Sequence, residues 1–108
     1  MKILITGVAG LLGSRLADWI IENTDNEVIG VDDMSGGYEE NVSDKVHLYK
    51  RDLSIDNIDD LFEEWKPDVV YHLAAYAAEG LSPFIRKFNY RNNLVSTANV
   101  INECIKHN

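Results

Sequence analysis

A glycine-rich turn between a short apolar strand and a helix constrains the fold of this 108-residue chain more than any other feature. Residues 2–13 read KILITGVAGLLG, in which Gly7, Gly10 and Gly13 are spaced three residues apart. Gly7 would turn the chain off the strand, Gly10 would let backbone approach a pyrophosphate, and Gly13 would let the helix pack closely on the sheet. Free N–H groups and the positive end of the helix dipole favour an anion there. The spacing therefore predicts a dinucleotide-binding turn.

The residues that follow supply the context that such a turn requires. Residues 27–31 are predicted to form a second strand, which ends at Asp32. In dinucleotide-binding folds, a carboxylate about 20 residues after the glycine turn binds the ribose hydroxyls. Asp32 lies close to this distance from Gly13. Since residues 33–37 contain no arginine to pair with a 2′-phosphate, NAD is favoured over NADP as cofactor. The alternative interpretation is a tight glycine turn followed by a surface aspartate.

The helix that follows the glycine turn is predicted to have one apolar face, made up of Leu12, Leu16, Trp19 and Ile20.

Composition narrows the class of protein and of partner. The chain length fits one domain, residues 1–108, and a formal net charge of −8 argues against nucleic acid or an anionic membrane surface as partner. No stretch approaches the ~18 apolar residues of a membrane span, and no signal peptide is expected. Cys104, on an apolar helical face, is interpreted as a small buried hydrophobe without a catalytic role. We therefore expect a cytoplasmic protein.

The alternation of apolar and polar residues predicts further strands and helices downstream. Residues 46–50 would form a third strand, and Ser54 would be the N-cap of a second helix. The sheet-facing stripe of that helix would be Ile55, Ile58, Leu61, Phe62 and Trp65. Its acidic residues are interpreted as a solvated face, and no metal ligand is predicted. These acidic residues are Asp56, Asp59, Asp60, Glu63 and Glu64.

The last part of the chain is predicted to form a buried strand and a long helix. Residues 69–73 are nearly all apolar, which is typical of a strand covered on both faces. Ser82 and Pro83 would begin a helix of about 23 residues with two apolar stripes. One side would contact the sheet and the other a partner helix. The first stripe contains Phe84, Phe88, Leu94, Ala98, Ile101 and Ile105, and the second contains Thr97, Val100 and Cys104.

The order of these elements predicts an α/β fold. It would be a Rossmann-type, doubly wound parallel sheet in three layers, with strand order 3-2-1-4. A ligand would bind where the order reverses, between the glycine turn and residues 73–76. Ala74 and Ala75 would let backbone approach a flat ligand, although two alanines that merely follow a strand are an equal alternative. The polar loop at residues 35–45 would lie near the adenosine end.

Several short motifs together resemble the extended short-chain dehydrogenases/reductases. They are TGVAGLLG, the strand-end Asp32, RDL at 51–53, HLAA at 72–75 and NLVST at 93–97. The most similar members are nucleotide-sugar epimerases and dehydratases, particularly UDP-glucose 4-epimerases. The resemblance implies that Asn93 braces the nicotinamide region. It also implies pyrophosphate contacts from Gly7, Gly10, Leu11 and Leu12, ribose contacts from Asp32 and Asp33, adenine contacts from Asp52 and Leu53, and nicotinamide contacts from Leu73, Ala74, Ala75 and Tyr76.

The catalytic pattern of that family has no counterpart in this sequence. The family uses Tyr-x-x-x-Lys, but no tyrosine here is followed by lysine four residues later, so no catalytic residue is assigned. We expect a truncated Rossmann domain that binds NAD, and that acts on a nucleotide sugar only with a complementing part. Residues 83–106 and strand 69–73 would contact that part or a second copy. The alternatives are a non-catalytic NAD-binding or dimeric interaction module, and part of a dehydratase or reductase.

Overall fold

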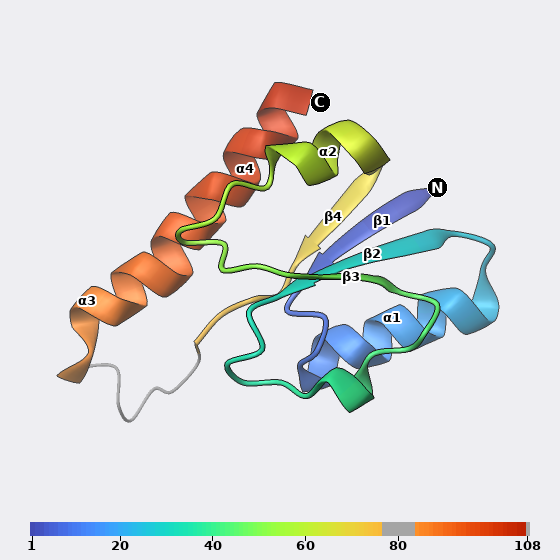
Figure 1. Ribbon diagram of the computed structural model, residues 1–108, viewed down its shortest axis with the longest axis horizontal. Coiled ribbons are helices and arrows are strands. Elements are labelled where there is room, and N and C mark those ends of the chain that lie inside the picture. Colours follow the sequence, from blue (N-terminus) through green and yellow to red (C-terminus); the bar gives the residue numbers. More distant parts are fainter. Residues whose placement is uncertain (77–83, 108) are drawn as a thin grey trace.

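The computed structural model describes residues 1–76 and 84–107, and shows a parallel sheet flanked by helices (Figure 1). The sheet order is β3-β2-β1-β4, which confirms the predicted topology. Its strands are β1 (Lys2–Thr6), β2 (Glu27–Asp32), β3 (His47–Lys50) and β4 (Val69–His72). All three pairings are parallel, and Thr6 of β1 lies opposite Val31 of β2 and His72 of β4.

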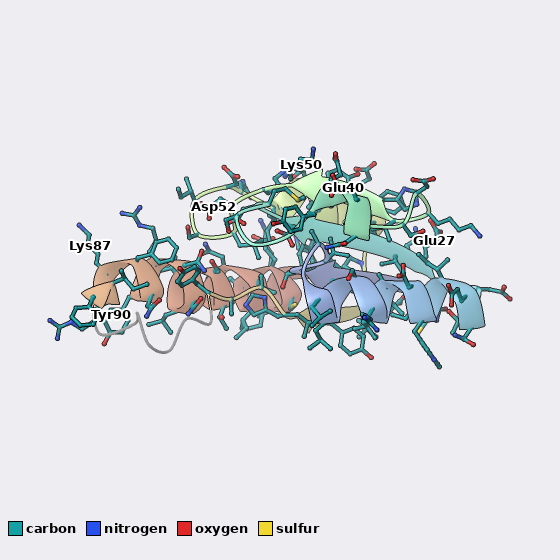
Figure 2. All side chains as sticks on the ribbon, turned by 90° about the horizontal axis from the view of Figure 1, so that it is seen from below. Glu27, Glu40, Lys50, Asp52, Lys87 and Tyr90 are labelled. Carbon is teal, nitrogen blue, oxygen red and sulfur yellow. The ribbon has the colours of Figure 1, made fainter. Side chains whose placement is uncertain are left out.

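Helices cover both faces of the sheet, so the three-layer expectation is also confirmed. Helix α1 (Leu11–Asn23) lies on one face, and α2 (Asp59–Trp65) and α4 (Ser96–His107) lie on the other (Figure 1). A short 3-10 turn, η1 (Glu39–Asn41), interrupts the loop between β2 and β3. Figure 2 shows that the molecule is thin and that the segment with Lys87 and Tyr90 extends past the sheet.

Each face of the sheet has its own hydrophobic core. On the α2 and α4 side, the buried cluster contains Leu4, Ile29, Val31, Leu53, Ile58, Leu61, Phe62 and Val100. On the α1 side, it contains Ile3, Ile5, Val8, Ala17, Ile20, Val28 and Val46. The alternation of β1 explains this division, because successive side chains of a strand point to opposite faces.

The face that α1 turns to the sheet differs from the predicted one. Its buried residues are mostly small, namely Gly13, Ser14, Ala17 and Ile20. Leu12 and Trp19, expected in the core, are 66% and 59% exposed. The reason is the close approach of helix and turn, since a Cβ on Gly13 would lie 2.1 Å from the carbonyl oxygen of Gly7. Large side chains are therefore excluded from the contact face.

Helix α2 begins later than predicted. Its first residue is Asp59, and Ser54 is not its N-cap. The Ser54 hydroxyl instead donates to Asp52 Oδ1 at 2.6 Å, which closes a turn before the helix. Ile55 is consequently 69% exposed rather than part of the core.

The last helical segment is continuous from residue 86 to residue 107. It consists of α3 (Arg86–Asn89), a π-helical stretch η3 (Tyr90–Val95) and α4, while the predicted start at Ser82 and Pro83 lies outside the described residues. The second stripe faces the core, through Val100 and the half-buried Cys104. The other stripe is exposed in the described structure, at Phe84, Phe88, Leu94, Ala98, Ile101 and Ile105.

Strand β4 lies at the edge of the sheet, with β1 as its neighbour. It is only half-buried, and Tyr71 is 43% exposed, so the expected burial on both faces is wrong for the described chain. Within residues 1–76 and 84–107, no helix is long and apolar enough to cross a membrane.

Candidate functional site

A cleft of about 150 Å³ opens at the carboxyl ends of the strands, where the strand order reverses. It brings together ten of the fourteen predicted site residues: Gly7, Gly10, Asp32, Asp33, Asp52, Leu53, Leu73, Ala74, Ala75 and Tyr76. Leu11, Leu12, Gly13 and Asn93 are not part of its lining. The lining also includes residues 35–37, from the loop that was expected near the adenosine end. Its remaining members were not predicted: Val31, Arg51, Asn92 and Ser96.

The three glycines of the turn have different surroundings. Gly7 has φ of +73°, and a Cβ there would lie 2.8 Å from the backbone nitrogen of Ala74. A Cβ on Gly13 would clash with Gly7, as described above. A Cβ on Gly10, in contrast, would meet only the Gly7 carbonyl oxygen at 3.4 Å, an ordinary contact. Protein packing thus requires glycine at 7 and 13, whereas the space beside Gly10 opens on the cleft.

Helix α1 presents its N-terminus beside this open space. Gly10 is the N-cap residue and provides no side-chain hydrogen bond to the first turn. The first N–H groups of a helix have no partner within the helix, and they carry the positive end of its dipole. Leu11 and Leu12 have side chains that are 76% and 66% exposed, so their contribution to an anion site would come from the backbone.

Asp32 joins the end of β2 to the glycine turn. Its Oδ2 accepts a hydrogen bond from the Ala9 N–H at 2.9 Å, and its Oδ1 accepts one from the Met34 N–H at 2.8 Å. An ionised carboxylate offers about four acceptor positions, so two remain for a ligand. The side chain is fixed by backbone donors and still able to accept from two further hydroxyls.

Asp33 and Asp52 each hold a loop of the cleft in place. Asp33 Oδ1 accepts from both the N–H and the hydroxyl of Ser35, at 2.9 and 2.6 Å. Asp52 Oδ1 accepts from the N–H and hydroxyl of Ser54 in the same way. Leu53 is buried in the core, and its carbonyl accepts from Asn99 Nδ2 of α4 at 2.7 Å.

Arg51 is the cation of the cleft lining, and it is already paired. Its Nη1 and Nη2 donate to the two carboxylate oxygens of Asp60 at 2.7 and 2.9 Å. These bonds raise the pKa of Arg51 and lower that of Asp60. The pairing draws the positive charge of Arg51 toward α2. The other ionisable groups of the lining are the carboxylates of Asp32, Asp33 and Asp52 and the phenol of Tyr76.

The wall opposite the glycine turn is held by a helix distant in sequence. Asn93 of η3 accepts from the Tyr76 N–H through Oδ1 at 2.7 Å and donates through Nδ2 to the Tyr76 carbonyl at 3.0 Å. The Tyr76 ring also packs edge-on against Phe88, with ring centroids 5.1 Å apart. Although Asn93 lies outside the cleft, it fixes the backbone of a lining residue.

The loop after β2 carries a local sequence signal for its place in the lining. A Cβ on Gly37 would lie 2.5 Å from the Ala9 carbonyl oxygen, so the loop after β2 packs against the glycine turn. The pair Gly36–Gly37 could have indicated this close approach. Asn92 and Ser96 lie in and next to the π-helical stretch, and the sequence carries no comparable sign of their approach.

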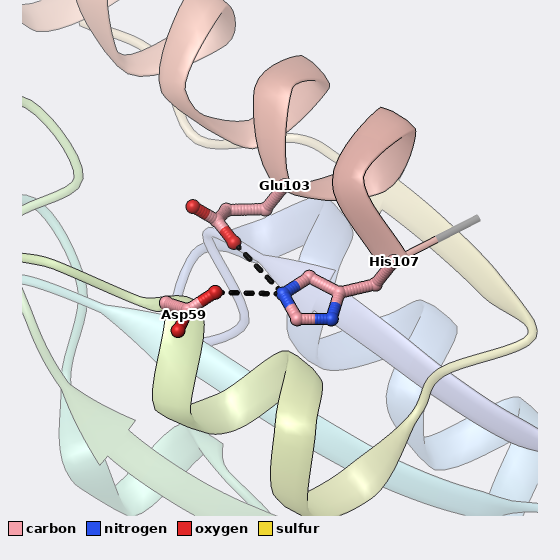
Figure 3. Close-up of side chains that lie close together, drawn as sticks. All are labelled: Asp59, Glu103 and His107. Atoms are coloured by element: carbon pink, nitrogen blue, oxygen red, sulfur yellow. Dashed lines mark hydrogen bonds and ion pairs between the residues drawn. The ribbon is translucent and has the colours of Figure 1, made fainter.

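A second cluster of ionisable groups joins α2 to α4 (Figure 3). His107 Nε2 lies 2.7 Å from Asp59 Oδ1 and 3.2 Å from Glu103 Oε2, and Lys106 Nζ lies 2.8 Å from Asp59 Oδ1. Hydrogen bonds from Lys106 and then His107 lower the pKa of Asp59 to about 2. These groups include possible metal ligands, but ion pairing accounts for their arrangement. Asp59, whose side chain is 24% exposed, is therefore tethered between the two helices and departs from the expected solvated face. The other acidic residues of that face are exposed as expected: Asp56, Asp60, Glu63 and Glu64.

The features of the cleft fit a dinucleotide. The open space beside Gly10 and the N-terminus of α1 suit a pyrophosphate, and the spare acceptors of Asp32 suit a ribose diol. The carboxylates of the lining and the paired state of Arg51 disfavour the extra phosphate of NADP.

Several curated proteins similar to this chain are named as enzymes that act on nucleotide sugars. UDP-glucose 4-epimerase of Mycolicibacterium smegmatis is 36% identical over 102 residues, which cover 90% of this chain and 32% of the relative. UDP-glucuronic acid decarboxylase 6 of Arabidopsis thaliana is 35% identical, over 94% of this chain and 29% of the relative. The dTDP-glucose 4,6-dehydratase of Salmonella typhimurium is 39% identical, over 69% of this chain and 23% of the relative. The chain thus spans about a third of these relatives or less.

Solved structures of similar proteins share the fold. UDP-glucose 4-epimerase of Thermotoga maritima, determined with UDP-glucose, superposes with a TM-score of 0.94 at 31% identity, over 99% of this chain and 35% of the other. The Thermus thermophilus enzyme, in complex with NAD, gives a TM-score of 0.89 at 30% identity, over 99% of this chain and 34% of the other.

The profile of one protein family matches nearly the whole sequence, at residues 3–108. The family is the one that the sequence motifs indicated, and its description names the expected cofactor, NAD. On the match, the relatives and the fold together, the chain belongs to the NAD dependent epimerase/dehydratase family.

Proposed function

We propose that this chain is the NAD-binding N-terminal portion of a nucleotide-sugar epimerase of the UDP-glucose 4-epimerase type. The observation that carries the proposal is the contrast between the glycines of the turn. Gly7 and Gly13 are required by packing, but a Cβ on Gly10 would meet nothing closer than 3.4 Å within the protein. A glycine that packing does not need, at a helix N-terminus, is what a bound pyrophosphate requires.

The proposed cofactor contacts run along the cleft from β2 to β4. The backbone of the turn binds the pyrophosphate, Asp32 and Asp33 bind the adenosine ribose, and residues 73–76 lie along the nicotinamide half. Asn93 supports this last segment through Tyr76. The assigned residues are Gly7, Gly10, Leu11, Leu12, Gly13, Asp32, Asp33, Asp52, Leu53, Leu73, Ala74, Ala75, Tyr76 and Asn93.

NAD, when bound, would supply a reversible hydride acceptor for a sugar carbon, and return of the hydride to the opposite face would invert that carbon. The residues of this chain bind and orient the cofactor. They do not include the Tyr-x-x-x-Lys pair that would remove the hydroxyl proton. Turnover would therefore need a further part that supplies this pair and binds the sugar.

Two exposed surfaces suit such further contacts. The outer edge of β4 would pair with a strand of the remaining polypeptide or of a complementing chain, because exposed strand edges favour association. The exposed stripe of α3, η3 and α4 would pack on the same stripe of a second copy, to form a homodimer. We propose the cytoplasm as the location, since one half-buried free cysteine suits a reducing compartment.

A sugar-nucleotide dehydratase is the second candidate. The observation that favours it is the 39% identity with the Salmonella typhimurium dehydratase over 82 residues, slightly above that with the epimerase. A UDP-glucuronic acid decarboxylase matches 94% of this chain, and a nucleotide-sugar reductase is a further alternative. A non-catalytic NAD-binding module remains a further alternative, because the chain holds no proton-transfer pair.

Calorimetric titration of the purified protein with NAD and with NADP tests the binding proposal. We expect saturable binding of NAD and weaker binding of NADP. Absence of NAD binding would overturn the proposal.

Complementation then separates an epimerase portion from a non-catalytic module. A separately produced C-terminal part of the Mycolicibacterium smegmatis relative is added, and conversion of UDP-glucose is followed. Restored interconversion with UDP-galactose supports the epimerase portion, whereas a 4-keto sugar product supports a dehydratase. NAD binding without any turnover would favour the module.

A further inference from the structure

His72, at the end of β4, bridges the end of β1 and helix α4, which both lie next to the cleft. Its Nδ1 lies 2.7 Å from Thr6 Oγ1 at the end of β1, and its Nε2 lies 2.9 Å from Thr97 Oγ1 of α4. The ring is half-buried, and no sequence motif assigned it a function beyond membership of the HLAA segment.

The hydrogen-bond partners decide where the imidazole proton lies. The Thr97 hydroxyl donates to the Asn93 carbonyl at 2.6 Å, so its proton is already used. Thr97 Oγ1 must therefore accept from His72, which places the ring proton on Nε2. At the other nitrogen, Thr6 Oγ1 accepts from the Ala74 N–H at 3.1 Å, and its hydroxyl proton is free to be donated to Nδ1. Every donor in this arrangement has an acceptor.

The result is one directional chain of hydrogen bonds through the neutral ring. It runs from the Ala74 N–H to Thr6, from Thr6 to His72, from His72 to Thr97, and from Thr97 to the Asn93 carbonyl. A proton on Nδ1 would leave the Thr6 hydroxyl without that acceptor, so the charged ring fits poorly. Burial lowers the pKa of His72 below its ordinary 6.5, in agreement with a neutral ring.

Both ends of this chain are residues of the proposed nicotinamide side. Ala74 lines the cleft, and Asn93 holds Tyr76 by two hydrogen bonds. The π-helical stretch ends at Val95, between Asn93 and Thr97. The Thr97 side chain contacts His72 of β4, and the Asn93 side chain contacts Tyr76 in the segment after it. His72 thus connects the two ends of this wall by hydrogen bonds to Thr6 and Thr97.

We propose that His72 is a positioning residue of the NAD site, which as a neutral ring with its proton on Nε2 fixes Ala74 and Asn93 in one arrangement. The inference rests on the proposed function for its ligand. It assigns no proton transfer to His72, because the ring does not line the cleft.

The test combines binding with a direct readout of the ring. NAD affinity is measured for the unsubstituted protein and for Thr97→Val, which removes the acceptor of the Nε2 proton, and for Thr97→Ser, which keeps it. Loss of one hydrogen bond, about 1 kcal/mol, corresponds to about a fivefold weaker affinity. We expect this loss in Thr97→Val and recovery in Thr97→Ser. The control for His72→Gln is His47→Gln, which makes the same change at a half-exposed histidine of β3. We expect His47→Gln to leave the NAD affinity unchanged.

Nitrogen-15 NMR of the imidazole reports the tautomer independently of NAD. A neutral ring protonated at Nε2 at pH 7 is expected, and a ring that is charged or protonated at Nδ1 would overturn the inference. So would NAD binding by Thr97→Val equal to that of the unsubstituted protein. If the unsubstituted protein does not bind NAD at all, the proposed function fails, and the role of His72 in that site fails with it. Melting temperatures of all variants separate a positional effect from loss of folding.

Discussion

The Oδ2 atom of Asp32 accepts a hydrogen bond from the backbone N–H of Ala9 at 2.9 Å. This bond ties the carboxyl end of β2 to the middle of the glycine turn, which also donates from the Gly7 N–H to the Val31 carbonyl at 2.8 Å. The carboxylate proposed to bind ribose and the backbone proposed to bind pyrophosphate are thus held in a fixed relation before any ligand arrives. Such preorganisation reduces the entropic cost of binding.

Asp32→Asn should weaken NAD binding by about 1–3 kcal/mol, the range for a charge-assisted hydrogen bond. The amide keeps one oxygen acceptor but loses the charge that strengthens bonds from ribose hydroxyls. Its NH2 group also replaces one of the two oxygens that accept from the Ala9 and Met34 N–H groups. The same substitution should narrow the preference for NAD over NADP, because a negative charge next to a 2′-phosphate is removed. Calorimetry with both dinucleotides measures this, with Asp25→Asn as a surface control. Equal NAD affinity in Asp32→Asn would refute the ribose assignment.

Gly10→Ala should mainly weaken NAD binding, whereas Gly13→Ala should mainly lower the free energy of unfolding. At position 10 the new Cβ meets only Gly7 oxygen at 3.4 Å, so stability should fall by less than about 1 kcal/mol while NAD affinity drops at least about tenfold. At position 13 the Cβ would lie 2.1 Å from the same oxygen, and unfolding free energy should fall by about 3 kcal/mol. Urea denaturation and NAD titration of both variants provide the comparison. A Gly10→Ala protein that binds NAD normally would contradict the proposed pyrophosphate position.

Ile101→Lys should weaken self-association through the exposed helical stripe. Ile101 is 50% exposed, and Leu94 and Ile105 of the same stripe are 61% and 74% exposed. A lysine at the centre of a helix pair would have to be desolvated without a partner. Analytical ultracentrifugation should show a dimer for the unsubstituted protein and a monomer for Ile101→Lys. Asn102→Lys, one residue away and off the stripe, is the control and should remain dimeric. A monomeric unsubstituted protein would rule out this homodimer.

The predictable parts of the molecule are those that local spacing determines. Strand order followed from the alternation of elements, because parallel crossovers have a fixed hand. The predicted bounds of β2, β3 and β4 each differ from the observed ones by one residue. The orientation of α1 did not follow, since periodicity placed Leu12 and Trp19 in the core, whereas the contact of Gly13 with Gly7 selects a face of small residues. Close backbone approach outweighed hydrophobicity there.

Contacts between distant residues were the least predictable. The two apolar stripes of the last helix could be identified, but only the structure shows that Val100 faces the core and Ile101 does not. The support of Tyr76 by Asn93 was implied by resemblance, while the link through His72 depends on a π-helical stretch that has no clear sequence signal. Hydrogen bonds between elements more than 15 residues apart depend on tertiary geometry, which local propensity does not determine.

Asp59→Asn should remove part of the stability of the protein at neutral pH and change its acid dependence. Hydrogen bonds from Lys106 and then His107 lower the pKa of Asp59 from 3.8 to about 2. A carboxyl group with a lower pKa in the folded state stabilises that state when it is ionised. This contribution is complete above the unfolded pKa, and it is lost as pH falls from about 4 to about 2.

The urea midpoints of the unsubstituted protein and Asp59→Asn should therefore differ at pH 5 and converge as the pH falls from about 4 to about 2. Asp44→Asn, at an exposed carboxylate, should follow the unsubstituted protein at every pH. The difference should also decrease in high salt, because Lys106 is 60% exposed and its charge is screened. If the urea midpoints of the two proteins differ by the same amount down to pH 2, the contact between α2 and α4 does not depend on the charge on Asp59. Packing of the buried cluster that contains Phe62 and Val100 would then hold these helices together.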